Sequence, residues 1–299
     1  MLDFGGKNQL PVWIKRSDME RITEFTKAPV TVHHPHGYET PFVASIPHSG
    51  TYIPPLLKGL YTQTHLSRLR NTDWHLQDIY DFLPELGVTT IEADFSRYVI
   101  DVNRGLEQLS GGQSYRSSLI YTKDTWGDPI LKDAGCDLRE EFRIAHFYRP
   151  FHAILQETIN AKIERFGHAY VLDMHSFAVE TEADICLGAG RHGDKGANLK
   201  DQLSRDFNAL GFTLASLPQF SGGHIVRHYG AQPHVEACII ELKYNTYMRD
   251  SSANGDHMPH LEPVRANATK SKLKKALTGT INAFESISGR RQGYARLSL

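Results

Sequence analysis

The 299-residue sequence has few cysteines, almost no net charge and no long apolar run. Cys136, Cys186 and Cys238 stand in scattered apolar settings, which predicts buried thiols in a reducing cytoplasm and excludes a disulfide framework. Lys and Arg number 33 against 34 Asp and Glu, so no basic field would attract nucleic acid or an anionic membrane. No run approaches the ~20 apolar residues of a membrane span, and the first residues lack the apolar centre of a secretion signal. We therefore expect a cytoplasmic protein that binds neither nucleic acid nor membrane.

The motifs of several common enzyme classes are also missing. There is no G-x-x-x-x-G-K-[ST], G-x-S-x-G, H-E-x-x-H or C-x-x-C sequence, which argues against kinase, α/β-hydrolase, zincin and zinc-finger classes. The stretch GAGRHG at 188–193 matches a dinucleotide fingerprint, but no acidic residue ends the next predicted strand. We interpret it as a glycine-rich turn.

Short apolar runs alternate with amphipathic ones along the chain. The short runs predict strands at 41–46, 88–93, 97–102, 169–174, 183–188, 212–217 and 236–242. The amphipathic runs predict helices at 73–87, 140–167 (broken or kinked at Pro150), 194–211 and 270–287. This alternation predicts an α/β fold, a three-layer α/β/α sandwich with a mixed, largely parallel central sheet.

The N-terminal part differs in composition from the rest. Residues 1–40 are polar and contain several Pro and Gly, which predicts an extension packed on the domain. His33, His34 and His36 within it are interpreted as an exposed loop, because no carboxylate or strand end frames them. No linker interrupts residues 41–299, which we expect to form a single α/β domain.

Polar side chains gather at the ends of the predicted strands, where ligands bind in open α/β sheets. Each has a plain interpretation: a lone histidine is usually a loop residue, Asp73 could be only a helix N-cap, and Arg104 could pair with a surface carboxylate. Glu241 is harder to dismiss, because a carboxylate in an apolar run needs a partner. Together the pattern suits a mononuclear zinc site with three protein ligands and one open position. The polar residues that form this pattern at the strand ends are His48, Asp73, Asp101, Asn103, Arg104, Asp173, His175, Ser176 and Glu241.

The same residues lie in segments that resemble a known family. The chain resembles the N-formylglutamate amidohydrolases, which are related to zinc carboxypeptidases and aspartoacylase. The resemblance spans about residues 43–249 and implies a zinc-exopeptidase-like fold, so that 41–299 would be a metallohydrolase domain. The matching segments, in the family's order, are IPHSGTYIP, DWHLQDIYDF, FSRYVIDVNRG, FYRPFH, LDMHS, SGGHIVRHYG and IELKYNTYM.

The resemblance also implies a set of site residues. His48, Asp73 and His175 would bind one zinc ion per chain, and Glu241 would be the catalytic carboxylate. Carboxypeptidase-like sites carry Glu three residues after the first histidine, but Thr51 stands there, so the carboxylate ligand is assigned to Asp73.

The sequence DVNR resembles the DLNR stretch of aspartoacylase, where Asn and Arg hold the substrate. This implies that Asn103 and Arg104 bind a substrate carboxylate, with Arg227 as a second candidate. Asp173, two residues before His175, is expected either to point to the opposite face of its strand or to orient a ligand.

The activity implied is hydrolysis of N-formyl-L-glutamate to formate and L-glutamate, a step of histidine breakdown. Residues 108–129 match the histidine-pathway enzymes only loosely, so two alternatives remain open. One is a related zinc-dependent deacylase or carboxypeptidase acting on another N-acyl amino acid, and the other is a non-catalytic binding protein on the same fold. A serine hydrolase using Ser49 is a weaker third alternative.

Overall fold

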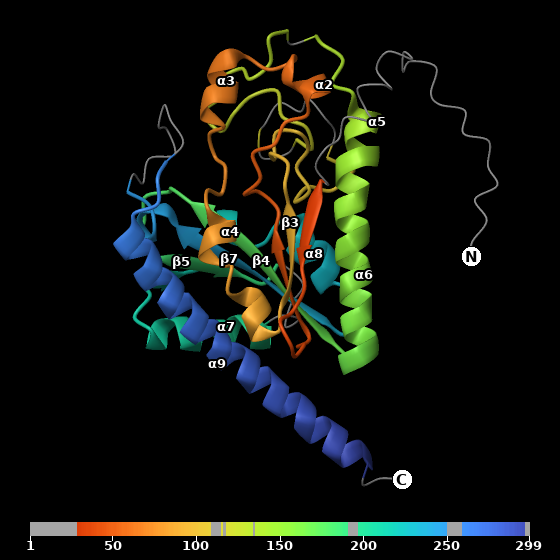
Figure 1. Ribbon diagram of the computed structural model, residues 1–299, viewed down its shortest axis with the longest axis vertical. Helices are drawn as coiled ribbons and strands as arrows, with labels where there is room; N and C mark the ends of the chain where they lie inside the picture. Colours follow the sequence, from red (N-terminus) through yellow and green to blue (C-terminus); the bar gives the residue numbers. More distant parts are fainter. Residues whose placement is uncertain are drawn as a thin grey trace, which may run out of the picture.

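Seven strands form one central sheet (Figure 1). The computed structural model describes residues 29–108, 115, 118–133, 135–190, 197–249 and 259–296. The strands lie in the order β1-β3-β2-β4-β7-β5-β6; only the pairs β1/β3 and β5/β7 are antiparallel, and the other four are parallel. This confirms the predicted α/β class with a mixed, largely parallel sheet. The strands are β1 (Val30–His33), β2 (Phe42–Ile46), β3 (Thr89–Ala93), β4 (Ala169–Phe177), β5 (Ile185–Gly188), β6 (Leu214–Ala215) and β7 (Val235–Lys243).

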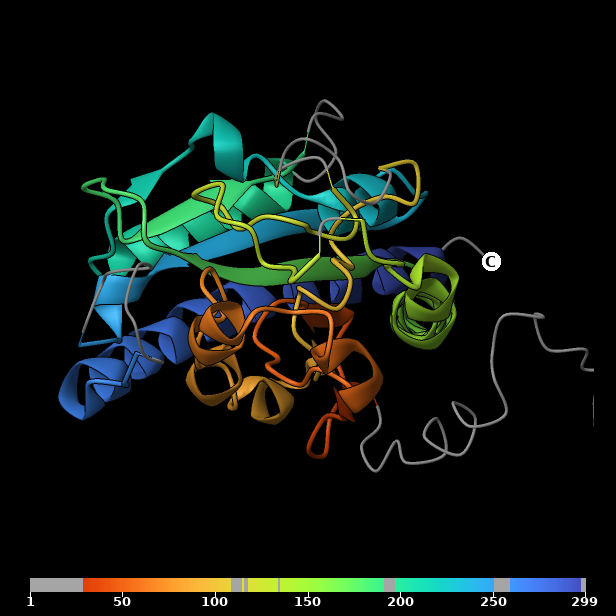
Figure 2. The ribbon, with the colours of Figure 1, turned by 90° about the horizontal axis from the view of Figure 1, so that it is seen from above.

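Helices cover both faces of this sheet. α4, α7 and α9 pack with Phe42, Leu172 and Ile240 on one face, whereas α6 and α8 pack with Val171 and Ile239 on the other. Figure 2 shows α8 and α9 on opposite sides of the strands, which gives the three layers expected. None of the helices in the described ranges is long and apolar enough to cross a membrane.

The α-helices are α2 (Pro55–Lys58), α3 (Gln63–Arg68), α4 (Leu76–Ile79), α5 (Glu140–Arg143), α6 (Arg149–Phe166), α7 (Ala197–Ala209), α8 (His224–Gly230) and α9 (Pro263–Arg296). A π-helical segment, η3 (Ile144–Tyr148), joins α5 to α6. Short 3-10 helices are η1 (Leu83–Leu86), η4 (Pro218–Phe220) and η5 (Tyr244–Thr246).

The strand expected at 97–102 is wrong. The segment is buried but consists of turns, and its main-chain groups bond outside any sheet. The fully buried Arg143 donates to the carbonyls of Tyr98 (3.2 Å) and Val99 (2.7 Å), and the N–H of Asp101 donates to the carbonyl of Leu119 at 2.9 Å. An apolar run of this length does not reveal whether its backbone meets a strand or a side chain.

A strand also lies where an extension was expected. Val30–His33 pairs antiparallel with β3 as an edge of the sheet, so this part of residues 1–40 is integral to it. Nε2 of His33 lies 3.2 Å from Oε1 of Glu92, so a carboxylate does frame this histidine. Residues 1–28 of the expected extension lie outside the described residues.

The helices differ from expectation in their breaks. The helix expected at 73–87 is two short pieces, α4 and η1. The break expected at Pro150 is the π-helical segment just before it; because proline has no N–H, the bond to the residue four back is lost and the helix widens there. Cys186 and Cys238 are buried as expected, whereas Cys136 is only half-buried.

The loop after β2, with the sequence PHSG at 47–50, crosses close over the end of β3. A Cβ built on Gly50 would lie 2.3 Å from the carbonyl oxygen of Ala93 and 2.4 Å from the carbonyl carbon of Asp94. Both contacts are main chain and cannot rotate away. Glycine is therefore required here for the loop to place His48 at the sheet edge.

We expect Gly50→Ala to lower the free energy of unfolding by about 1–3 kcal/mol, because the loop must move off β3. Urea unfolding of the full chain measures this. Gly59→Ala is the matched control: its φ is −63° and an added Cβ would meet nothing within 4 Å. Stability there should be unchanged or higher by about 0.4–1 kcal/mol. Equal effects of the two substitutions would contradict the close approach at Gly50.

Candidate active site

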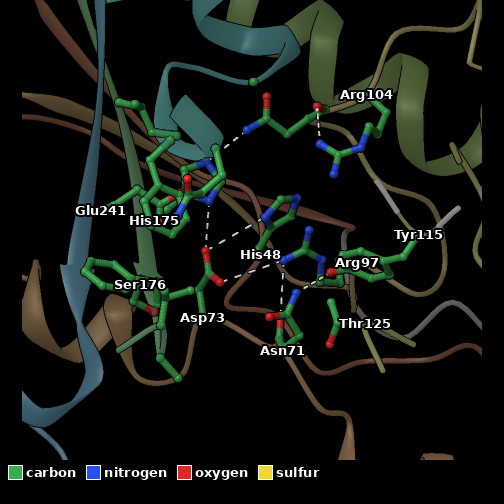
Figure 3. A pocket seen from close by; sticks show the side chains of 18 of the residues that line it. His48, Asn71, Asp73, Arg97, Arg104, Tyr115, Thr125, His175, Ser176 and Glu241 are labelled. Atoms are coloured by element: carbon green, nitrogen blue, oxygen red, sulfur yellow. Dashed lines mark hydrogen bonds and ion pairs between the residues drawn. The ribbon is translucent and has the colours of Figure 1, made fainter. Parts of the chain in front are cut away.

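His48, Asp73 and His175 meet at the end of the central strands (Figure 3). One potential ligand atom from each lies within 4.8 Å of the others, and all three side chains are buried. His48 comes from the loop after β2, Asp73 from the segment between α3 and α4, and His175 from β4 itself. The structure thus brings together the three residues expected to bind metal, and the group could hold an ion.

Each histidine ring has one nitrogen on a carboxylate and the other facing Asp73. Nε2 of His48 donates to Oδ1 of Asp101 at 2.7 Å, and Nε2 of His175 lies 3.0 Å from Oδ2 of Asp173. Oδ2 of Asp73 lies 2.8 Å from Nδ1 of His175 and 3.8 Å from Nδ1 of His48. Metal-binding histidines are oriented in this way, with a carboxylate on the outer nitrogen.

The inner nitrogen of His48 decides whether a cation fits. Burial, with the positive charge of Arg97, lowers the pKa of His48 to about 4, so the ring is neutral near pH 7. Its proton is on Nε2 toward Asp101, which leaves a lone pair on Nδ1. That atom is buried without a hydrogen-bond partner and faces a carboxylate oxygen of Asp73. Two electron-rich atoms so placed favour a cation between them, so these residues fit a metal ion.

Asp173 orients His175 and does not point away from it. Side chains two positions apart in a strand share one face, so the expectation of an opposite-facing Asp173 is wrong. Burial acts to lower the pKa of His175, but the charges of Asp173 and Asp73 outweigh it and raise that pKa well above its usual value. The two carboxylates therefore favour the protonated form of the His175 ring.

Asp73 lies in a stretch of strained backbone and does not cap a helix. The residue at the N-cap of α4 is His75, whose side chain makes no capping bond, so the N-cap interpretation of Asp73 is wrong. Leu69, Asn71 and His75 all have positive φ, of 39°, 62° and 60°. Such residues are uncommon outside glycine and persist where the surroundings fix them.

Arg97 is a site residue that sequence reasoning missed. Its guanidinium is 3.1 Å from Oδ2 of Asp101 and 3.9 Å from Oδ1 of Asp73, and it lies over the rings of Tyr115 and Tyr121. Tyr121 also donates its hydroxyl hydrogen to Asp101. The spacing of four residues between Arg97 and Asp101 was the available signal, but it was hidden because 97–102 was expected to be a strand.

Glu241 lies directly beside His175. The two are register partners in the parallel pair β4/β7, so their side chains emerge from the same face of the sheet. Burial raises the pKa of Glu241 to about 8; Asp73 and Asp173 add to this, against the opposing charges of His175 and Arg97. A carboxyl with such a pKa can accept and release a proton near neutral pH.

The residues expected to bind substrate differ in their freedom. Oδ1 of Asn103 accepts the N–H of Ile225 at 2.9 Å and its Nδ2 donates to Asp173 at 3.0 Å, so both ends of this amide hold the site together. Arg104 donates to the carbonyl of Asn103 at 3.2 Å, and Arg227 to that of Gly222 at 2.7 Å. A substrate contact through the Asn103 amide would have to replace one of its two bonds.

The three candidate metal ligands, the residues expected to bind substrate, Arg97 and Glu241 line one cavity of about 1080 Å³. Within the described part of the chain, Ser49 does not line it and donates its hydroxyl hydrogen to Gln77. Arg97 and Lys123 add to the positive charge of the cavity wall. The residues assigned from the sequence that line the cavity are His48, Asp73, Asn103, Arg104, His175, Arg227 and Glu241.

Comparison with known proteins places this site in a family. A family model described as N-formylglutamate amidohydrolase matches residues 40–248. The chain belongs to the N-formylglutamate amidohydrolase family. This confirms the resemblance seen in the sequence and the expected enzyme class, a hydrolase acting on amide bonds.

Individual relatives agree with this membership. An N-formylglutamate deformylase of Pseudomonas aeruginosa is 30% identical over 242 residues, which cover 76% of this chain and 89% of the relative. One of Pseudomonas putida is 29% identical over 228 residues, covering 72% and 85%. The crystal structure of the N-formylglutamate amidohydrolase from Ralstonia eutropha JMP134 has a TM-score of 0.71 at 24% identity, covering 89% of this chain and all of that one. This last similarity supports the fold.

We expect Arg97→Met to lower the free energy of unfolding by about 3–5 kcal/mol, because it leaves buried carboxylates without their countercharge. Urea unfolding of the chelator-treated protein measures the change. Arg165→Met is the matched control, since Arg165 pairs with Glu39 but its side chain is 62% exposed. That loss should stay within about 1 kcal/mol. Similar losses for both variants would contradict a role of Arg97 in balancing the buried charge.

Proposed function

We propose that this chain is a zinc-dependent enzyme that hydrolyses N-formyl-L-glutamate to formate and L-glutamate. The observation that carries the proposal is the buried group His48–Asp73–His175, with the unpartnered Nδ1 of His48 turned toward Asp73 and Glu241 alongside. Family membership supports the substrate, because relatives that cover most of the chain are named N-formylglutamate deformylases. A cytoplasmic location and a role in histidine breakdown belong to the same proposal.

The ion would be held by Nδ1 of His48, Nδ1 of His175 and the carboxylate of Asp73. Two histidines and one carboxylate are a ligand set that zinc uses in catalytic sites, with a further position left for water or substrate. Asp101 and Asp173 keep the two rings in the required orientation. A zinc ion held there supplies Lewis acidity, which polarises a carbonyl oxygen and makes water a stronger nucleophile at neutral pH.

Glu241 is the proposed proton carrier. In the reaction, water adds to the formyl carbon and the bond from that carbon to the amide nitrogen breaks. Glu241 takes a proton from the attacking water and returns it to the departing nitrogen, so that formate and the free amine leave. Its register pairing with His175, one of the proposed zinc ligands, supports this role.

The substrate carries two carboxylates, and besides Arg97, which pairs with Asp101, two arginines line the cavity. We assign these roles to Arg104 and Arg227, since a guanidinium binds a carboxylate through two parallel hydrogen bonds. Asn103 contributes through its main-chain carbonyl, which accepts a hydrogen bond from Arg104. Its side-chain amide fixes the first turn of α8 to Asp173, so we propose that it acts on the substrate indirectly.

The size of the cavity favours one alternative activity. About 1080 Å³ exceeds the space that a small formyl amino acid fills, so a related deacylase or carboxypeptidase acting on a larger N-acyl amino acid is the second candidate. A non-catalytic binding protein would have no use for a buried carboxylate beside the histidines.

We expect the purified chain to release formate from N-formyl-L-glutamate and to contain about one zinc ion per chain. A chelator should abolish turnover and added zinc should restore it, because the zinc ligands are the buried histidines and Asp73. Formate release and elemental analysis are the measurements. His175→Ala should contain no zinc, and added zinc should not restore its turnover.

His152→Ala serves as the control for that variant. His152 is also largely buried, but its ring contacts the hydroxyl of Tyr229 and the carbonyl of Val102, away from the metal group. It should keep its zinc. Turnover that survives chelation would contradict the metal and favour Ser49. Faster release of acetate from N-acetyl-L-glutamate than of formate would favour the alternative deacylase, and no turnover of either would favour a binding protein.

Glu241→Gln should fold, keep its zinc and lose roughly 10²–10⁴-fold in kcat, because glutamine has the shape of glutamate but cannot carry the proton. Steady-state kinetics and zinc content are measured together. Glu236→Gln on the same strand is the matched control, since Glu236 accepts the N–H of Leu199 and does not line the cavity. Loss of zinc from Glu241→Gln would identify Glu241 as a ligand, and a wild-type rate would remove it from the mechanism.

A further inference from the structure

The segment that carries Asp73 has an unfavourable backbone conformation that contacts with the rest of the structure must stabilise. We name residues 69–75, between α3 and α4, the ligand loop. Three of its non-glycine residues, Leu69, Asn71 and His75, have positive φ. Such a backbone conformation is unfavourable for a non-glycine residue and persists only where the surrounding structure imposes it. The contacts that impose this backbone therefore also fix the position of Asp73.

Two buried tyrosines hold the carbonyl groups on either side of Asp73. The hydroxyl of Tyr244 donates to the carbonyl of Thr72 at 2.6 Å, and that of Tyr247 to the carbonyl of Trp74 at 3.0 Å. Both tyrosines are almost fully buried, with exposures of 1% and 0%. The residue before Asp73 and the residue after it are thus both anchored from outside the loop.

The two tyrosines belong to the segment that directly follows the strand of Glu241. β7 ends at Lys243, Tyr244 begins η5, and Tyr247 follows it. The loop is also held further back, where Tyr98 donates to the carbonyl of Arg70 at 2.6 Å and Arg97 to that of Asn71 at 3.1 Å. Tyr244 and Tyr247 bond from outside the loop to the two residues that flank Asp73, and the main-chain N–H of Asp73 itself donates to the carbonyl of His48 at 3.1 Å.

We propose that Tyr244 and Tyr247 are positioning residues that hold the Asp73 carboxylate in place for metal binding. The inference rests on the zinc site proposed above. Because both phenols start from the end of β7, they also set the distance between the Asp73 ligand and the Glu241 carboxylate. Tyr247→Phe removes the hydrogen bond to the buried carbonyl of Trp74, and Tyr244→Phe leaves the carbonyl of Thr72 with only the main-chain N–H of Trp74. In both variants the strained loop can relax, which moves Asp73 relative to His48 and His175.

The test uses Tyr244→Phe and Tyr247→Phe, made separately in the full chain, since phenylalanine keeps the ring and removes only the hydroxyl. Zinc affinity is measured by competition with a chromogenic chelator, and the ligand geometry by the visible absorption of the cobalt(II)-substituted protein. We expect about 10–100-fold weaker zinc binding and a changed cobalt spectrum. Activity on N-formyl-L-glutamate should recover toward wild type as zinc is raised.

Tyr229→Phe is the matched control. Its buried hydroxyl lies 2.9 Å from Nδ1 of His152, remote from the ligand loop, so zinc affinity and the cobalt spectrum should not change. Thermal unfolding of the metal-free proteins shows whether each variant folds, and either phenylalanine variant alone decides the question.

The outcomes separate this inference from the function on which it rests. If wild type binds zinc and the variants of Tyr244 and Tyr247 bind it equally well, with only a loss of stability like that of Tyr229→Phe, the phenols are structural and the inference is overturned. The proposed function would then stand. If wild type binds no zinc, the metal site and this inference both fail.

Discussion

Four buried carboxyl groups lie together at the carboxyl ends of the central strands, and the rest of the site compensates the charge of those that are ionised. Asp73, Asp101, Asp173 and Glu241 all lie within the interior beside the cavity. Removing such charges from water is costly unless each is paired or bonded. Arg97 supplies positive charge, and a divalent ion bound by His175 would replace the proton that this ring binds without the ion. A buried cluster of this composition suits a cation, in keeping with the metal site proposed above.

Regular strand geometry alone brings three of the site residues together. In the parallel pair β4/β7, His175 and Glu241 are register partners, and Asp173 is two residues before His175 on the same face. Three functional side chains therefore converge because strand spacing is fixed and side chains alternate. His48 and Asp73 come from loops, whose geometry follows no such rule. His48 needs Gly50 to cross β3, and Asp73 needs the tyrosines that hold its neighbours.

This difference between strand and loop residues explains how much of the site could be predicted from the sequence. Glu241 could be marked as a site residue because it interrupts an apolar strand with a group that needs a partner, whereas His175 was marked only as a polar residue at the end of a predicted strand. His48 and Asp73 could be named only by resemblance, since a histidine in a turn and an aspartate before a helix both have plain interpretations. The role of Arg97 could not be seen, because its contacts with Asn71 and Asp101 depend on turns that the pattern did not reveal. Within the segment at 97–102, the carbonyls of Tyr98 and Val99 accept hydrogen bonds from Arg143, more than forty positions away in sequence.

The turns at 97–104 are required by the contacts that orient His48. In an extended strand, residues four apart are separated by roughly 13 Å, at about 3.3 Å per residue. Arg97 and Asp101 instead form an ion pair at 3.1 Å, while the other oxygen of Asp101 accepts both Nε2 of His48 and the main-chain N–H of Asn103 at 2.8 Å. An arginine, an aspartate and an asparagine within seven residues can meet at one point only if the backbone folds back on itself. The apolar run predicts a strand because these residues are buried, but the ion pair excludes one. The segment is buried as deeply as the sheet, and it is irregular because it brings together the groups that orient His48.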